Sequence, residues 1–128
     1  MAYAQVGVET RIAGADPHQL ILMLFDGALM AVSSASHQME LGDTAAKGQS
    51  ISRAIDIIGN GLKVSLDLDA GGELAQRLFA LYDYMCARLL HANSQNDRAA
   101  LEEVSHLLGE LKSAWEEIRQ KLVQGSPM

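Results

Sequence analysis

The sequence is poor in cysteine and lacks the segments that would send a protein out of the cytoplasm. Its single thiol, Cys86, cannot form an intramolecular disulfide, and it lies in an apolar helical pattern where a reduced, buried thiol is expected. The opening residues, MAYAQVGVET, have neither the basic region nor the apolar region of a secretory signal. The longest apolar run, Leu20 to Phe25, falls far short of the ~18–20 residues that span a bilayer. These absences predict a cytoplasmic protein without membrane insertion.

Basic residues are also scarce. Ten Lys and Arg stand against sixteen Asp and Glu, which gives a net charge of -6 at pH 7. Such a chain repels phosphate backbones and acidic membrane surfaces, so no nucleic-acid partner is expected. Apolar residues make up 48% of the 128 residues, which is enough for one folded domain with a core of its own.

Capping residues mark where the first helix begins and ends. Asp16, Pro17 and Gln19 form a helix start, in which an N-cap carboxylate is followed by a proline at the first helical position. Gly42 supplies a C-terminal stop, and the side chains at 43–44 can cap the next helix. The sequence therefore predicts a first helix from 16 to about 41 and a second that follows directly.

Apolar spacing indicates three further helices. The second is weakened by glycines and carries the stripe Ile51, Ile55, Ile58, Leu62 and Leu66. The segment DLDAGG at 67–72 predicts a break, after which a third helix runs from about 73 to 92, and NSQND at 93–97 closes it. The fourth has alternating steps of three and four, typical of a helix packed nearly parallel or antiparallel to its neighbours: Leu101, Val104, Leu108, Leu111, Trp115, Ile118 and Leu122.

Four long helices joined by short connections predict an all-α fold, an antiparallel four-helix bundle. No alternating run demands a strand. We expect residues 16–124 to form the bundle, residues 1–15 to be an N-terminal segment that covers it, and residues 125–128 to be a frayed tail.

The stretch LILMLFDGALMAV at 20–32 has more apolar surface than one helix face needs, because eleven of its thirteen residues are apolar. One face holds Leu20, Leu24, Gly27, Ala28, Ala31 and Ala35, and a second stripe beside it holds Ile21, Phe25, Leu29 and Val32. On the third helix, Leu74, Leu78, Leu81 and Met85 are expected to face the core, and the apolar surface extends sideways over Ala75, Phe79, Tyr82, Cys86 and Leu90.

Two interpretations of this surplus remain open. The extra stripes either broaden the core or pack under the N-terminal segment, or they form a contiguous patch for a partner. Methionines beside the stripes would tolerate varied partners. The pattern does not decide which apolar residues are core and which contact a partner.

No pattern in the chain points to catalysis, a cofactor or a metal. Glu103 and His106 form one Glu-x-x-His pair, but the fourth-helix stripe turns both outward and no second pair exists. The GNG at 59–61 lacks the Lys-Ser/Thr of a phosphate-binding loop, and Cys86 has no base at a suitable spacing. We expect no enzymatic activity.

Four ordered blocks resemble the flagellar export chaperones that are specific for flagellin. They are QLILMLFDGAL (19–29), ISRAIDIIGNGLKVSLD (51–67), GGELAQRLFALYDYMCARLLHAN (71–93), and EEV at 102 followed by SAW at 113. The resemblance implies a cytoplasmic helical bundle that binds the disordered C-terminal segment of flagellin. It also implies that the protein blocks premature filament assembly and helps deliver flagellin to the flagellar type III export gate.

The surplus apolar stripes and the resemblance together predict a partner-binding surface. Its expected residues are Tyr3, Val6, Ile12, Ile21, Phe25, Leu29, Val32, Phe79 and Tyr82. The N-terminal members match the family segment that can fold over the client site. An amphipathic client segment would lay its apolar side chains into grooves beside the first and third helices. The alternative is a structural helical-bundle protein that forms a homodimer through its surplus apolar faces. For the chaperone itself, a homodimer is a possible state when no client is bound.

Overall fold

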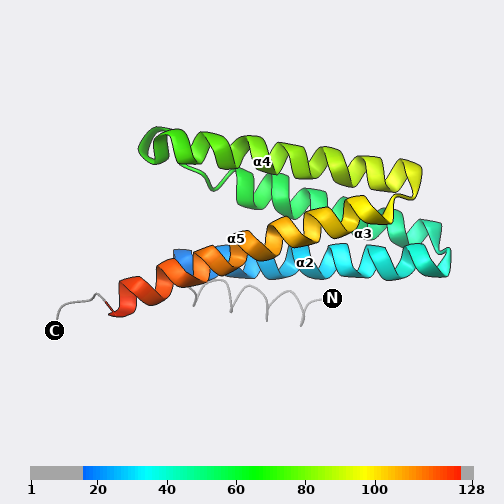
Figure 1. Cartoon of the computed structure of the whole chain (residues 1–128), viewed down its shortest axis with the longest axis horizontal. Coiled ribbons are helices and arrows are strands. Elements are labelled where there is room, and N and C mark those ends of the chain that lie inside the picture. The colour runs from blue at the N-terminus through cyan, green and yellow to red at the C-terminus, as the bar shows by residue number, and fades with distance from the viewer. Residues whose placement is uncertain (1–15, 125–128) are drawn as a thin grey trace, which may run out of the picture.

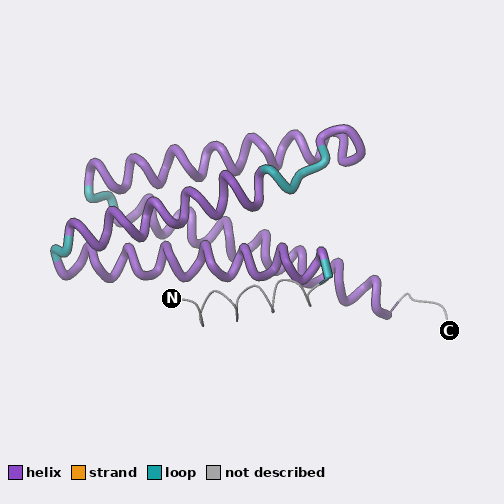
Figure 2. Tube along the Cα trace, turned by 180° about the vertical axis from the view of Figure 1, so that it is seen from behind, coloured by secondary structure: helices purple, strands orange, loops and turns teal. Residues whose placement is uncertain are grey.

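A computed structural model describes residues 16–124, apart from the side chains of Arg119 and residues 121–124. These residues form four long helices and no strand: α2 (Pro17–Leu41), α3 (Thr44–Ile57), α4 (Leu68–Gln95) and α5 (Arg98–Gln124), with a π-helical turn, η1 (Ile58–Lys63), continuing α3. The helices run alternately in opposite directions, as Figures 1 and 2 show from opposite sides. The predicted all-α, antiparallel four-helix bundle is therefore confirmed. The N-terminal segment and the tail lie outside the described residues.

Each helix packs against two neighbours, so that the four surround a central core. The order around the bundle is α2, α3, α4, α5 and back to α2. A helix with two neighbours buries a wider arc than one stripe. Both predicted stripes of α2 accordingly contribute buried residues, Ala28 and Ala35 from one and Phe25 and Val32 from the other. The surplus on this helix is smaller than the sequence suggested.

The predicted limits of α2 are confirmed. The Asp16 carboxylate accepts from the backbone N–H of Gln19 at 2.7 Å, and Pro17 opens the helix. Gly42 ends it at φ 72°, a left-handed conformation that glycine adopts without steric cost. The Asp43 carboxylate then accepts from the N–H of Ala46 at 3.2 Å and caps α3.

The turn η1 occupies the glycine-weakened part of the second helix. A π turn bonds i to i+5 and takes in an extra residue, which fits the two successive four-residue steps from Ile58 to Leu62 to Leu66. Gly61 lies here against α2, where a Cβ atom would stand 3.2 Å from Cδ2 of Leu24. In this turn Leu62 remains buried, and Gly61 allows the turn to lie close to α2.

The third helix begins earlier than predicted. The Asp67 carboxylate caps α4 by accepting from the N–H of Ala70 at 3.0 Å, and helix starts at Leu68 rather than at about residue 73. Gly72 interrupts it with φ 56° and ψ -137°, a conformation open almost only to glycine. The break expected at 67–72 is thus a kink inside α4, preceded by one helical turn.

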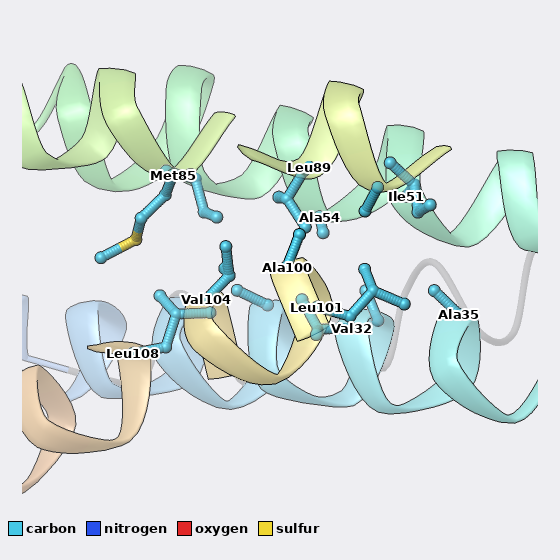
Figure 3. Packing of buried hydrophobic residues seen from close by; sticks show 14 of the residues in the cluster. Val32, Ala35, Ile51, Ala54, Met85, Leu89, Ala100, Leu101, Val104 and Leu108 are labelled. Carbon is cyan, nitrogen blue, oxygen red and sulfur yellow. The ribbon is translucent and has the colours of Figure 1, made fainter. Parts of the chain in front are cut away.

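The core lies between the four helices (Figure 3) and is built from small residues on α2 and branched residues on its neighbours. On α4 the predicted core stripe was wrong only at Leu74, which is 68% exposed; Met85 is completely buried, and Leu78 and Leu81 pack against the core. The buried hydrophobic residues among those described are Phe25, Ala28, Ala31, Val32, Ala35, Ile51, Ala54, Ile58, Leu62, Ala75, Tyr82, Met85, Leu89, Ala92, Ala100, Leu101, Val104 and Leu108.

By length and mean hydropathy alone, α2 could cross a membrane. One such helix is weak evidence for a membrane span, because core helices of soluble proteins pass the same test, and α2 packs against both α3 and α5. Charged groups also join it to α5, where the Lys112 ammonium lies 2.7 Å from the Asp26 carboxylate.

A buried lysine lies at the end of the bundle where α3 begins and α4 ends. Lys47 near the start of α3 is only 3% exposed, and its ammonium donates to the backbone carbonyl of Asn93 at 3.0 Å and to the Asn96 side-chain oxygen. Asn96 ends α4 in a left-handed conformation with φ 49°. Lys47 therefore links the start of α3 to the C-terminal end of α4 by hydrogen bonds. A positive charge at a helix C-terminus is also stabilised by the helix dipole.

We expect Lys47→Met to lower the free energy of unfolding by about 1–3 kcal/mol, because it removes both hydrogen bonds and leaves their acceptors unpaired. Lys112→Met, at a largely solvated ion pair, should cost less than about 1 kcal/mol. Urea unfolding of the three proteins measures both. A Lys47→Met protein as stable as the wild type would show that the cost of burying the ammonium cancels its bonds.

Candidate functional site

The apolar stripe of α5 changes its surroundings halfway along the helix. Leu101, Val104 and Leu108 are completely buried, whereas Trp115 is half-buried and Ile118 is 47% exposed. The second half of α5 diverges from α4 and runs along the first turns of α2 (Figure 1). Its apolar side chains there line a groove instead of filling a core.

The deeper part of this groove is a cavity of about 260 Å³, called here the inner cavity. It lies where α2, α4 and α5 meet the segment that follows η1. No charged side chain is among the described residues that line it: Ile21, Phe25, Leu62, Ser65, Leu66, Leu74, Leu78, Tyr82, Leu111, Ala114, Trp115 and Ile118.

A wider, more open cavity of about 900 Å³ adjoins the inner one and is called here the outer cavity. It lies beside the first turns of α2 and is lined by Pro17, His18, Leu20, Ile21, Met23, Leu24, Ser65, Trp115 and Ile118. Four residues line both cavities: Ile21, Ser65, Trp115 and Ile118. The two cavities together are called the groove below.

Three of the predicted partner-binding residues meet in the groove. Ile21 lines both cavities, and Phe25 and Tyr82 form part of the inner wall. Phe25 is 3% exposed and Tyr82 is 4% exposed, so both are also members of the core.

The other predicted residues lie elsewhere. Leu29 packs against the core, and Val32 is buried at 1% exposure without lining the groove. The Phe79 ring lies under the Lys63 ammonium, 4.6 Å from its centroid. Tyr3, Val6 and Ile12 fall outside the described residues.

The sequence analysis assigned most of the groove wall to the core. The residues it missed are Leu62, Leu66, Leu74, Leu78, Leu111, Trp115 and Ile118. The sequence carries no separate signal for Leu111, Trp115 and Ile118, because they continue the fourth-helix stripe without a change in spacing.

The polar candidates of the sequence are occupied in other contacts. Glu103 accepts from the Tyr84 hydroxyl and, at 2.8 Å, from Nε of Arg88, which joins α5 to α4. His106 lies 2.8 Å from the exposed Glu110 carboxylate. Burial raises the pKa of the Cys86 thiol and makes it less reactive. No group of three or more His, Cys, Asp or Glu side chains suited to a metal occurs in the described part of the chain.

The comparison with known proteins agrees with this architecture. The family model of the flagellar protein FliS matches residues 1–122. The chain belongs to the FliS family. The match extends over every helix that lines the groove.

Several curated members of the FliS family are close relatives. The flagellar secretion chaperone FliS of Salmonella typhimurium is 54% identical over 120 residues, covering 94% of this chain and 89% of that protein. The protein of the same name from Escherichia coli is 51% identical over 116 residues, covering 91% and 85%. The flagellar secretion chaperone FliSB of Pseudomonas aeruginosa is 47% identical over 116 residues, covering 91% of each.

Burial raises the pKa of the Tyr82 hydroxyl from 10.0 to about 12. The folded protein therefore holds this proton more tightly than the unfolded chain does. The resulting stabilisation is complete below pH 10 and is lost as the pH rises from 10 to 12.

We expect the free energy of unfolding of the wild type to fall by about 1 kcal/mol more than that of Tyr82→Phe between pH 9 and pH 11. Urea unfolding at the two pH values measures this difference, and groups common to both proteins cancel. An equal fall in the free energy of unfolding of the two proteins would show that the Tyr82 hydroxyl is solvated in the folded state.

Proposed function

We propose that the chain is a cytoplasmic, non-catalytic flagellar secretion chaperone whose groove binds the disordered C-terminal segment of flagellin. Bound in this way, the segment is unavailable for filament assembly, and the complex is delivered to the flagellar type III export gate. The observation that carries the proposal is an uncharged apolar groove that is continuous with the core and bordered by exposed apolar side chains.

The border of the groove supports a partner rather than simple core packing. Leu74 is 68% exposed and Ile118 is 47% exposed, and both line the inner cavity. Large apolar side chains that stay exposed beside a concave apolar surface are typical of an interaction site. Because the cavities also reach buried residues such as Phe25, a client side chain placed there would extend the core of the bundle.

The chemistry of the groove suits a segment that is disordered when free. Aliphatic and aromatic side chains dominate the inner wall, and none of its residues is charged. Binding would therefore rest on apolar burial, with a negative change in heat capacity and little dependence on salt. A disordered client can fit its apolar residues to such a surface, at the cost of becoming ordered.

A flagellin segment that occupies the groove is thereby kept from assembling into a filament too early. A segment whose apolar side chains lie in the groove cannot use the same side chains to pack against other flagellin subunits. Ordering the disordered segment on binding lowers the net affinity. The client can therefore dissociate without the breaking of a covalent or metal bond. These properties match a carrier that must give up its client.

We expect Leu74→Asp to weaken binding of a peptide with the C-terminal sequence of flagellin by tenfold or more, because the new carboxylate would have to lose its water on binding. Leu90→Asp is the matched control: Leu90 is on the same helix and 60% exposed, but it lines neither cavity. Calorimetry measures both affinities, and circular dichroism checks that each variant keeps its helices.

Two results would contradict the proposal. One is a folded wild-type protein that binds neither the peptide nor full-length flagellin. The other is equal loss of binding in Leu74→Asp and Leu90→Asp. If the wild type does not bind flagellin and sedimentation shows a dimer that Leu74→Asp converts to a monomer, the groove is a homodimer interface instead.

A further inference from the structure

The start of α2 and the second half of α5 are joined by one pair of aromatic rings. The His18 imidazole stacks on the Trp115 indole, with ring centroids 4.4 Å apart and planes inclined by 12°. The two residues are 97 positions apart in the chain, so the contact depends on the tertiary fold. It lies at the groove, because both residues line the outer cavity.

Two reciprocal hydrogen bonds reinforce the stack. The Trp115 indole N–H donates to the backbone carbonyl of His18 at 2.9 Å, and Nε2 of His18 donates to the backbone carbonyl of Trp115 at 2.8 Å. A carbonyl only accepts, so Nε2 of His18 carries a proton. The indole cannot rotate away without losing both its stacking partner and its hydrogen bond. We call this contact the His18–Trp115 clasp.

Packing alone does not explain why position 18 has a histidine. The second imidazole nitrogen, Nδ1, is buried and has no hydrogen-bond partner within residues 16–124. An unpaired buried acceptor is unfavourable, and an apolar ring would fill the same space without that cost. What histidine adds at this position is the Nε2 donor, which fixes the orientation of Trp115.

Trp115 stands between the two cavities and forms a wall of each. On one side, the inner cavity of about 260 Å³ is walled largely by leucines, Leu74 and Leu78 among them. On the other, the outer cavity of about 900 Å³ opens toward solvent and is lined by Met23. Of the four residues shared by the two cavities, Trp115 has the largest side chain, so the orientation of its indole has the greatest effect on the boundary between the narrow site and the wide one.

We propose that His18 is a positioning residue that holds Trp115 as a fixed partition, so that the groove accepts two separate apolar side chains of its client. The inner cavity takes one compact aliphatic side chain, and the outer cavity takes a larger or aromatic one. This inference rests on the proposed function for the identity of the client, but the partition itself is a property of the free protein. Loss of the clasp would merge the cavities and remove their selectivity.

The first experiment tests the partition without flagellin. N-acetyl-leucinamide and N-acetyl-tryptophanamide are titrated into the full chain, and methyl NMR signals of Leu74 and Leu78 report the inner cavity while that of Met23 reports the outer. In the wild type, the leucine probe should shift the inner signals and the tryptophan probe only Met23. In His18→Ala, the tryptophan probe should shift both sets. A wild type in which it already shifts both has no partition, which overturns the inference.

Trp115 is the only tryptophan, so its signals report the clasp directly. In His18→Ala its fluorescence should move to longer wavelength and its near-ultraviolet dichroism should weaken, with the helical spectrum unchanged. His18→Gln keeps a donor and should restore part of the signal. His18→Phe keeps a stacked ring without the donor, and tests the clasp with the least change in packing. His37→Ala, at an exposed histidine of α2, is the matched control and should change nothing.

The second experiment uses the flagellin C-terminal peptide. We expect His18→Ala to bind it about tenfold more weakly, with His18→Gln between it and the wild type. Altered Trp115 signals with unchanged peptide affinity would make the clasp purely structural and overturn the inference. Absence of peptide binding by the wild type would instead refute the proposed function, and the probe titrations would still decide whether the partition exists.

Discussion

The length of the apolar stripe on α5 is the constraint on which the site depends. Its first half is matched by α2 and α4 and is completely buried, as at Leu101 and Leu108. Its second half diverges from α4, so Leu111, Trp115 and Ile118 have apolar surface that the other helices cover only in part. Hydrophobic burial is proportional to the area removed from water, and here it is left incomplete. The groove is the part of the core that the bundle does not close by itself.

Sequence patterns predicted the fold because caps and spacing are local properties. Asp16, Gly42 and Asp43 act through backbone groups a few residues away, and each has the role that the sequence indicated. The core face of α4 was harder to predict, because neighbouring stripes on one helix are similar. Leu74 is more hydrophobic than Ala75, yet the alanine is buried and the leucine is exposed, so hydrophobicity alone did not identify the buried face.

The groove was predicted only in part, because a stripe does not reveal where its neighbours end. Ile21, Phe25 and Tyr82 were identified from surplus apolar surface, but the same criterion selected Val32, which is core. Trp115 was placed in the core by its spacing. Its contact with His18 joins the two ends of the chain and has no local signal in the sequence. The π turn at η1 was visible only as a glycine-weakened stretch, although it sets which face Leu62 presents.

The buried ammonium of Lys47 makes one end of the bundle more resistant to local opening than the other. It joins α3 to the end of α4 at the end of the molecule opposite the groove, and an ion pair between Arg98 and Glu40 ties α5 to α2 nearby. Local opening is easiest where few apolar contacts hold the backbone, so hydrogen-exchange protection should decline from the lysine end toward the groove. Because the His18–Trp115 clasp holds α5 against α2 at the groove end, such an opening would move α4 away from this pair while the lysine end stays closed. A movement of this kind would widen the groove without unfolding the bundle.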